Sequence, residues 1–470
     1  MYLLLMIVIK RLINYFTPII SIAFCFVAIC SHYCWADSLN VSAAGEENNE
    51  TSSWYAINLI DTLRFRTYHL STEHFKDKYT LFNSDGDVID EPITTFLEVD
   101  GKADIKSRLF FYYKAQLKNS GIFDLKKGYA KYNNGTISLG AGKDTVWMGH
   151  GYHGSLLLSN NAEPFPLIKF QTERTLHVPY IGGFDYMIFN GWPEDLKIFG
   201  QRLSYKPVEI LEFGINQTVV YKRDYKIWEF LYVISAEEEN MPGSMWDNDQ
   251  RASLDIALYM PFLKKLPFLK NGKLYFEYAG EDLLAWWQKE DKEWFGPLGF
   301  ELAHQGKIYG LFLTTGPTDF RIEYAQNYIN LPLFDDPWGR AGVDRVTSAW
   351  YQKYPFVNYG VIMGHHMGSQ ADDLYFELKH RFNEFHEVKV FYDKERHGLA
   401  AFKDNPEEIY QHGFEYSYIY KRFTIEGLFI VNLYKNLDIN PDPLTIDIVK
   451  GKDAQEMITS IAVTYRFGLK

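Results

Sequence analysis

The chain has 470 residues, of which 17% are aromatic, and a formal net charge of −12 at pH 7. Such an acidic chain is not expected to bind nucleic acid. Beyond residue 36 no run of about 18 apolar residues occurs, which excludes membrane-spanning helices in that part of the chain. All three cysteines, Cys25, Cys30 and Cys34, lie near the N-terminus. Whatever follows residue 36 therefore has neither a disulfide nor a thiolate metal site.

The first 36 residues have the layout of a secretory signal peptide. Lys10 and Arg11 precede an apolar run over 12–30, and the segment Cys34-Trp35-Ala36 ends in small residues at the spacing of a cleavage site. We predict cleavage after residue 36, which moves the formal charge from −12 to −14 because two basic residues and no acid are removed. A retained membrane anchor is the alternative, although no basic stop-transfer flank follows.

Residues 37–53 form a polar tail without an apolar period, which we expect to be mobile. From residue 54 to 470 apolar or aromatic residues alternate with polar ones, and one face carries more charge than a packed soluble core accepts. The closing strand shows both faces: Ile461, Val463, Tyr465 and Phe467 lie on one, and Ala462, Thr464 and Arg466 on the other. We predict an all-β fold, a transmembrane antiparallel β-barrel of the outer-membrane type.

Length and turn chemistry give the expected strand number and topology. About 430 residues after cleavage allow on the order of 16 to 18 strands. Short periplasmic turns are predicted at Asn133-Asn134-Gly135, Lys206-Pro207, Gln305-Gly306, Asn383 to His386 and Tyr420 to Phe423. Long connections at 222–250, 282–296 and 329–354 should be external or folded into the lumen. With Gln305-Gly306 and Asn383 to His386 both as periplasmic turns, however, strand parity places 329–354 on the periplasmic side unless that stretch contains a further strand, so this connection stays unassigned.

No internal repeat or low-complexity block divides residues 54–470, so we predict a single domain. A large soluble β-sandwich or propeller is the alternative fold. Propeller blades would show a period of roughly 40 to 50 residues, and none is present.

The segment from Lys143 to Pro164, KDTVWMGHGYHGSLLLSNNAEP, resembles the signature of the capsule assembly Wzi family. Further similar segments follow in the family order at 200–207, 275–282, 321–325 and 364–368. The motif residues that this resemblance singles out are Trp147, Gly149, Gly151, Gly154, Ser155, Asn160 and Asn161.

The resemblance implies a monomeric barrel of about 18 strands in the outer membrane of a Gram-negative cell. It also implies a lectin-like protein without enzymatic activity or cofactor. Such a protein binds capsular polysaccharide or exopolysaccharide, helps to assemble or anchor it at the cell surface, contacts outer-membrane lipid and has export machinery as a further potential partner. The alternative function is a porin that passes polysaccharide or small acidic solutes.

Aromatic faces and basic side chains are the groups expected to hold an acidic polysaccharide. The candidates in the connections are Trp286, Trp287, Trp294 and Trp338, and those on polar strand faces are Arg64, Arg66, Arg108, Arg202 and Arg321. The tryptophans are equally suited to anchor the barrel at the membrane interface. For the arginines, pairing with luminal acids such as Glu277, Glu281 and Glu323 is the favoured role.

The glycine-rich stretch from Gly149 to Gly154 is expected to fold inward as a loop against the wall, because glycines allow a close backbone approach. We predict no metal site and no catalytic residues. His150 and His153 have no acid or cysteine at matched spacing, and the adjacent pair His365-His366 would point to opposite faces of a strand. Neither an opposed carboxylate pair nor a Gly-x-Ser-x-Gly motif is present.

Overall fold

The computed structural model describes residues 55–72, 79–226, 229, 244, 247–285, 300–329, 356–399, 405–437, 440–441, 448–449 and 451–467. The chain divides into two units, Met1–Ser53 and Trp54–Lys470, and all described residues belong to the second. Within them no helix is long and apolar enough to cross a membrane. The tryptophans 286, 287, 294 and 338 lie outside the described residues.

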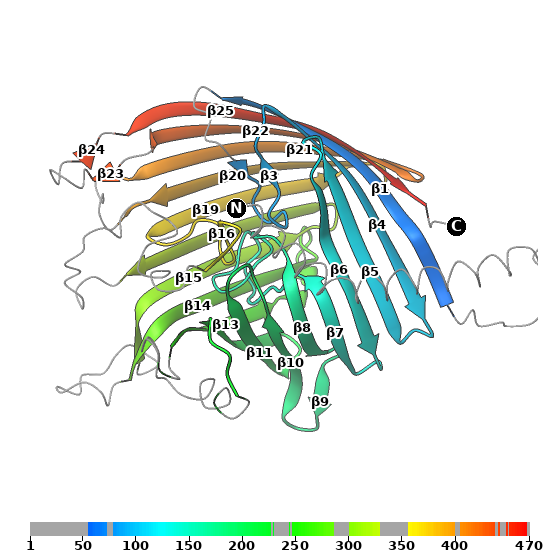
Figure 1. Cartoon of the computed structure of the whole chain (residues 1–470), viewed down its shortest axis with the longest axis vertical. Coiled ribbons are helices and arrows are strands. Elements are labelled where there is room, and N and C mark those ends of the chain that lie inside the picture. Colours follow the sequence, from blue (N-terminus) through cyan, green and yellow to red (C-terminus); the bar gives the residue numbers. More distant parts are fainter. Residues whose placement is uncertain are drawn as a thin grey trace, which may run out of the picture. The chain divides into compact units, whose positions relative to one another are not determined.

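The second unit is a closed antiparallel barrel (Figure 1). Its one large sheet contains 19 strands, of which β8 and β9 both pair with β10 and make a single crossing, so the wall has 18 strands. Closure occurs at β1, which pairs with both β4 and β25. In a closed barrel every strand is paired along both edges, so its backbone N–H and C=O groups have hydrogen-bond partners, as a membrane-spanning sheet requires.

The strands of the wall are β1 (Tyr55–Thr72), β4 (Ile93–Ile105), β5 (Leu109–Lys118), β6 (Phe123–Asn133), β7 (Ile137–Asp144), β8 (Phe165–Thr172), β9 (Leu176–Val178), β10 (Gly182–Gly191), β11 (Lys197–Val208), β12 (Leu211–Tyr221), β13 (Asn248–Tyr259), β14 (Asn271–Ala285), β15 (Phe300–Thr314), β16 (Thr318–Ile329), β19 (Ala371–Arg381), β20 (His386–His397), β21 (Glu407–Tyr420), β22 (Phe423–Leu437) and β25 (Lys452–Arg466). The elements that are not part of the wall are β2 (Tyr79–Thr80), β3 (Val88–Ile89), η1 (Pro261–Lys265), β17 (Val357–Asn358), β18 (Val361–Ile362), β23 (Asn440–Pro441) and β24 (Ile448–Val449).

The two faces of the closing strand are oriented as the alternation predicts. Ile461 is 60% exposed on the outer face, whereas Thr464 and Arg466 line a luminal cavity of about 280 Å³. On β5, Lys114 pairs with the buried Glu98 of β4 at 3.2 Å. Apolar side chains thus face outward and charged ones inward, the arrangement of a barrel in lipid.

The connections differ in length between the two ends of the barrel. One end has the short turns, among them 134–136, 209–210, 382–385 and 421–422, and the other has the long connections after β1, β7, β12, β14, β16 and β22. In outer-membrane barrels short turns face the periplasm and long loops face outside. The predicted turns at Asn133 to Gly135, Asn383 to His386 and Tyr420 to Phe423 are confirmed. The turn near Lys206-Pro207 comes slightly later, because β11 continues to residue 208.

The predicted turn at Gln305-Gly306 is wrong, because both residues lie inside β15 and the turn comes at 315–317. A Cβ on Gly306 would lie 2.9 Å from Cδ2 of Leu156, so this glycine permits close approach of a luminal segment. With that turn removed, the strand count places the connection between β16 and β19 at the long-connection end. The parity conflict of the sequence is thereby resolved.

Candidate functional site

Three segments fold into the lumen from the long-connection end and occupy part of it. They are the hairpin segment 79–92 with β2 and β3, the glycine segment 145–164, and the histidine segment 356–370 with β17 and β18. In Figure 1 they lie inside the barrel and are surrounded by its wall. Apolar side chains of the glycine and histidine segments form a buried cluster with wall residues; its members include Val146, Met148, Leu156, Leu157, Leu158, Ile308, Ala325, Met363 and Met367. Leu81 and Ile89 of the hairpin segment belong to a separate buried cluster with other wall residues. We call the three segments together the plug.

Hydrogen bonds join the three segments to one another. The Asn161 side chain donates to the carbonyl of Ile362 at 2.9 Å, and the Asn160 side chain donates to the carbonyl of Asn83 at 3.0 Å. The hydroxyl of Ser159 donates to the carbonyl of Gly364 at 2.7 Å. Two of the motif asparagines therefore hold the plug together as a unit.

Two buried wall carboxylates hold the glycine segment against the barrel. Glu323 of β16 accepts hydrogen bonds from the backbone amides of Tyr152 and His153 at 2.7 and 3.0 Å. Glu277 of β14 accepts from the amide of Leu156 at 3.0 Å and from the Ser155 hydroxyl at 3.2 Å. These bonds supply partners for backbone donors that are buried away from water.

Glycine is required where the segment meets its neighbours. Gly149 has φ +135°, and a Cβ there would lie 2.2 Å from Oε2 of Glu277. A Cβ on Gly154 would lie 2.3 Å from Cδ2 of His365. The expected inward fold of the Gly149 to Gly154 stretch, with close backbone approach, is confirmed by these distances.

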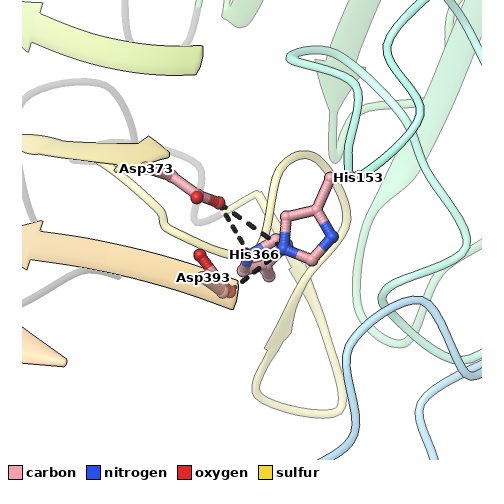
Figure 2. Close-up of side chains that lie close together, drawn as sticks. All are labelled: His153, His366, Asp373 and Asp393. Atoms are coloured by element: carbon pink, nitrogen blue, oxygen red, sulfur yellow. Dashed lines mark hydrogen bonds and ion pairs between the residues drawn. The ribbon is translucent and has the colours of Figure 1, made fainter. Parts of the chain in front are cut away.

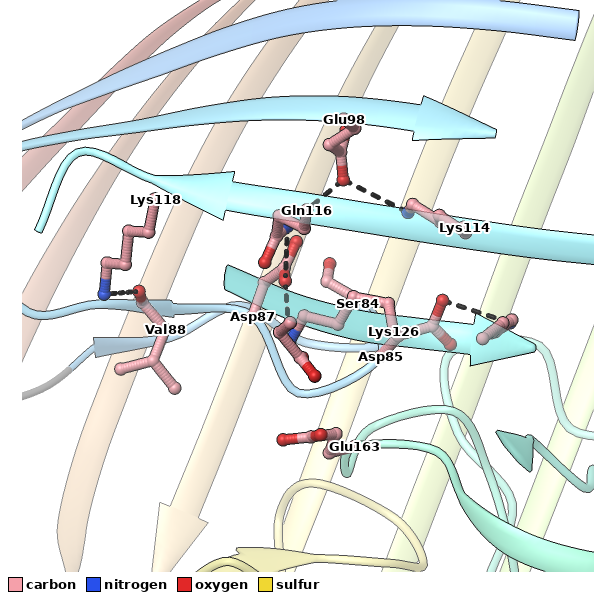
Figure 3. A network of polar contacts seen from close by, with 12 residues as sticks. Ser84, Asp85, Asp87, Val88, Glu98, Lys114, Gln116, Lys118, Lys126 and Glu163 are labelled. Atoms are coloured by element: carbon pink, nitrogen blue, oxygen red, sulfur yellow. Dashed lines mark hydrogen bonds and ion pairs between the residues drawn. The ribbon is translucent and has the colours of Figure 1, made fainter. Parts of the chain in front are cut away.

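A network of charges anchors the hairpin segment to the wall (Figure 3). Asp87 contacts the guanidinium of Arg66, accepts from the Gln116 amide at 3.1 Å, and lies 3.3 Å from the ammonium of Lys126. Lys118 donates to the carbonyl of Val88 at 3.1 Å. Each charge in this buried network has an opposite charge or hydrogen-bond partner, which offsets the cost of desolvation.

The predicted luminal arginines are paired with acids, but not with the acids expected. Arg64 lies 2.8 Å from Glu426, and Arg66 lies 3.2 Å from Glu98. Arg202 contacts Asp255 through two nitrogens, at 2.5 and 3.0 Å, and Arg321 lies 3.3 Å from Glu377. Glu277 and Glu323 instead accept hydrogen bonds from backbone amides of the plug. The side chain of Glu281 lies outside the described residues.

Arg108 does not lie on a polar strand face, so this prediction is wrong. Lys106 and Ser107 take positive φ values of 55° and 52°, which turns the chain before Arg108. The Arg108 amide donates to the carbonyl of Ile105 at 3.1 Å, and its side chain is exposed at the short-turn end.

Between the plug and the wall strands β1, β20, β21, β22 and β25 lies a cavity of about 670 Å³. Its lining includes the motif residue Trp147 and the luminal residues Arg64, Tyr152, Lys389 and Tyr416. Trp147 and Arg64 therefore face this cavity and not the outer rim.

A second pocket, of about 360 Å³, lies where β10 ends, β11 begins and β12 ends, at the long-connection rim. We call it the rim pocket, and its lining is Asn190, Trp192, Lys197, Tyr221, Arg223, Asp224 and Tyr225. Trp192 is 39% exposed. The rings of Tyr221 and Tyr225 lie 5.2 Å apart, and the Arg223 guanidinium carbon lies 5.6 Å from the Tyr225 ring centroid.

Sequence reasoning missed the rim pocket. Two signals were available: the tryptophan just after Asn190-Gly191 at a strand end, and the run Tyr221 to Tyr225, in which aromatic and basic residues follow a strand. Each is short and common by itself. Only the strand pairing of β11 with both β10 and β12 brings them together.

The four histidines weighed as metal ligands in the sequence all lie in luminal loops: His150, His153, His365 and His366. His150 lies 3.1 Å from Asp255 and 3.2 Å from Nζ of Lys273. Burial together with Lys273 lowers the pKa of His150 to about 4.

His365 and His366 follow β18 in a loop, and the centroids of their stacked rings lie 4.5 Å apart. The argument that they point to opposite faces of a strand is therefore wrong. His366 instead joins His153, Asp373 and Asp393 in one cluster (Figure 2).

A closed barrel with an apolar exterior, a charged interior and a packed plug defines a plugged transmembrane β-barrel of the outer-membrane type. The family model described as capsule assembly protein Wzi matches residues 66–428. The chain therefore belongs to the capsule assembly Wzi family.

Solved structures of similar fold include Wzi of Escherichia coli, described as an outer membrane protein involved in group 1 capsule assembly and a carbohydrate-binding β-barrel. It has a TM-score of 0.58 and 13% identity, with coverage of 87% of this chain and 85% of that chain. OccK5 (OpdH) of Pseudomonas aeruginosa has a TM-score of 0.47 and 10% identity, covering 87% and 98%. OccAB2 of Acinetobacter baumannii has a TM-score of 0.47 and 9% identity, covering 89% and 100%. No curated protein matched the sequence.

Proposed function

We propose that this protein binds capsular polysaccharide or exopolysaccharide at the outer rim of its barrel and helps to assemble or anchor it at the cell surface. Family membership and the fold shared with a carbohydrate-binding barrel support this role. The observation that carries it is the rim pocket, which combines Trp192, two tyrosines and two basic side chains at the end with long connections.

The rim pocket suits a chain of sugars on chemical grounds. Apolar faces of sugar rings pack on exposed aromatic rings such as Trp192. Basic groups bind the carboxylates of acidic sugars. Lys197 contacts Asp224, whose side chain is 96% exposed, and Arg223 lies 3.5 Å from Glu229. Exposed pairs of this kind contribute little to stability, so a sugar carboxylate can replace the protein acid.

The plug separates this role from that of a porin. A porin needs a water-filled path through its lumen, whereas here the glycine and histidine segments pack on the wall through the apolar cluster around Leu156 and Met363. Attachment at the rim requires no such path. The luminal arginines Arg64, Arg66, Arg202 and Arg321 then stabilise the interior of the barrel and do not contact sugar.

We further propose that residues 1–36 direct export, that 37–53 is a linking tail and that 54–470 is a monomeric barrel in outer-membrane lipid. The protein acts without catalysis, and export machinery can deliver polymer to it. Trp286, Trp287, Trp294 and Trp338 belong to connections that leave and re-enter the barrel at the same end as the rim pocket. They are proposed as additional contacts for polysaccharide.

The test is the amount of polysaccharide retained on cells that carry Trp192→Ala together with Tyr225→Ala. We expect several-fold less cell-bound polymer and more in the medium, at an unchanged level of heat-modifiable barrel in the outer membrane. Tyr180→Ala is the matched control, because Tyr180 is fully exposed in the turn at the opposite end. Normal retention by the double variant, with the barrel present at normal level, would exclude the rim pocket as the binding site.

A further inference from the structure

Four side chains from four different elements converge where the plug meets the wall. His153 belongs to the glycine segment, His366 to the histidine segment, Asp373 to β19 and Asp393 to β20, and all four are buried. Each offers one nitrogen or oxygen atom, and these four atoms lie within 4.8 Å of one another. Figure 2 shows the carboxylates of Asp373 and Asp393 beside His153 and His366, with dashed lines joining the carboxylates to the histidines.

The separations are close to those of a metal site. Nε2 of His153 lies 3.1 Å from Oδ2 of Asp393, and Nε2 of His366 lies 3.1 Å from Oδ2 of Asp373. Nε2 of His153 lies 3.8 Å from the same oxygen of Asp373. Ligand atoms about 2.0–2.2 Å from a tetrahedral zinc ion are roughly 3.3 Å apart. Small side-chain rotations therefore suffice to place all four atoms around one ion.

Neighbouring rings and a wall carboxylate fix the orientation of both imidazoles. The His153 ring stacks on Tyr375 at a centroid distance of 3.8 Å, and the His366 ring stacks on Phe82 at 4.0 Å. The backbone amide of His153 is held by Glu323. Ligands whose side chains are held in place by packing and hydrogen bonds are typical of built metal sites.

The charges around the cluster favour a cation. Asp373, Asp393 and the adjacent Glu395 are each at most 2% exposed. Among the described residues, the basic groups found within 4.0 Å of these three carboxylates are imidazoles, with neither a lysine nor an arginine among them. Excess buried negative charge of this kind is costly unless it is neutralised.

Hydrogen bonding satisfies only part of the cluster. Nε2 of His153 and Oδ2 of Asp393 form a hydrogen bond at 3.1 Å, whereas other atoms of the cluster lack a partner. Nε2 of His366, both carboxylate oxygens of Asp373 and Oδ1 of Asp393 are buried without an aligned hydrogen-bond partner among the described residues. Buried polar atoms nearly always have a partner. Nε2 of His366 and Oδ2 of Asp373 lie 3.1 Å apart without an aligned hydrogen bond, and a bound cation would give both atoms a partner.

We propose that His153, His366, Asp373 and Asp393 bind one divalent transition-metal ion, with zinc as the best-suited ion. Two imidazoles and two carboxylates form a mixed nitrogen and oxygen set that zinc accepts in tetrahedral geometry. Calcium and magnesium prefer oxygen ligands alone. The ion connects the glycine and histidine segments to strands β19 and β20, so its role is to lock the plug to the wall. This proposal is independent of any polysaccharide.

The experiment uses the whole mature protein, extracted from membranes without a polyhistidine tag or chelator. Elemental analysis should find one zinc per chain. After refolding with cobalt in place of zinc, the protein should show the intense visible absorption of tetrahedral cobalt. His366→Ala and Asp373→Asn should each reduce bound metal at least tenfold, while the heat-modifiable barrel persists on unboiled gels.

The matched control is His365→Gln. His365 neighbours His366 and is equally buried, but its ring nitrogen is not one of the four convergent atoms, so this variant should keep the metal. If a ligand variant fails to fold, the cobalt spectrum of the unaltered protein decides. A folded barrel that binds no zinc and gives no tetrahedral cobalt spectrum, or a folded His366→Ala variant that keeps its full metal content, would overturn the proposal.

Discussion

The guanidinium carbon of Arg321 lies 3.8 Å from the centroid of the Tyr152 ring, so a wall arginine of β16 covers an aromatic side chain of the plug. Glu377 of β19 completes this contact, because it lies 3.3 Å from Arg321 and accepts the Tyr152 hydroxyl at 3.0 Å. Tyr152 is 40% exposed, and a cation over an aromatic ring of this intermediate exposure contributes about 1 kcal/mol. The contact therefore helps to keep the plug closed.

Replacing Arg321 by alanine should make the plug open more often. A loss of about 1 kcal/mol corresponds to a roughly fivefold increase in the open fraction. Single-channel recording in planar bilayers measures it as the time spent in conducting states. Arg381→Ala, at an arginine whose side chain is 55% exposed at the end of β19, serves as the control and should behave as the unaltered protein. Identical recordings for both variants would mean that Arg321 does not restrain the plug.

Gly149→Ala should destabilise the seated plug. The new Cβ would lie 2.2 Å from Oε2 of Glu277, and φ +135° is unfavourable for alanine. We expect a loss of about 1–3 kcal/mol, observed as a lower temperature for the loss of the heat-modifiable band or as increased conductance. Gly427→Ala is the control, since a Cβ there meets nothing within 4 Å. Equal behaviour of the two alanine variants would argue against the described seating.

Charge substitutions test the two faces of the last strand. Ile461→Lys places an ammonium on the lipid face and should cost about 2–4 kcal/mol near mid-bilayer or block assembly. Thr464→Lys places the same charge in the luminal cavity of about 280 Å³, and its effect should be much smaller. Urea unfolding in lipid vesicles gives both values. A similar loss of unfolding free energy in both variants would show that the assignment of the lipid and luminal faces of β25 is wrong.

The pH dependence of stability should carry a contribution from His150. Burial, with Lys273, lowers its pKa to about 4, whereas an unfolded histidine titrates near pH 6.5. The unfolded chain therefore takes up a proton that the folded barrel does not, and stability falls as the pH falls from about 6.5 toward 4. Each pKa unit corresponds to about 1.4 kcal/mol, so the loss is at most a few kcal/mol.

Unfolding midpoints in urea across that pH range measure this contribution. His150→Gln should flatten the slope, and His177→Gln, at an exposed histidine on β9, should leave it unchanged. A slope that His150→Gln does not alter would assign the acid sensitivity to other groups.

A strain that lacks the protein separates attachment from transport. If the plugged barrel attaches polymer at the rim, the deletion strain should still export polysaccharide and release much of it into the medium. An essential pore would give the opposite result, with polymer retained in the periplasm. The amount in each compartment distinguishes the two, and periplasmic accumulation with steady single-channel currents would favour the porin function.

The barrel could be predicted from the sequence because alternation is a local property of each strand. The faces of β25 and the turn at Asn133 to Gly135 follow from residues that are neighbours in the chain. The error at Gln305-Gly306 has a non-local cause. Gly306 is a glycine because Leu156 packs against it across the lumen, and a local pattern does not distinguish this from a turn.

The plug and the histidine cluster could not be predicted for the same reason. The partners of the glycine segment depend on which strands face it after closure: Leu156 bonds to Glu277 across 121 residues, and His153 contacts Asp393 across 240. The motif glycines indicated a close approach without indicating what would be approached. The luminal arginines indicated acid partners, and the register of the strands then selected which acids.

The three wall groups that hold the glycine segment, Glu277, Glu323 and Asp393, all come after it in the chain. Until β14 and β16 are in place, the amides of Tyr152, His153 and Leu156 lack the carboxylates that accept from them, and an unsatisfied amide inside the barrel is costly. The segment can therefore seat only in a wall that is nearly complete. A molecule halted before that step would leave an open hole in the membrane, so sealing the cell's permeability barrier depends on the final stage of this protein's own assembly.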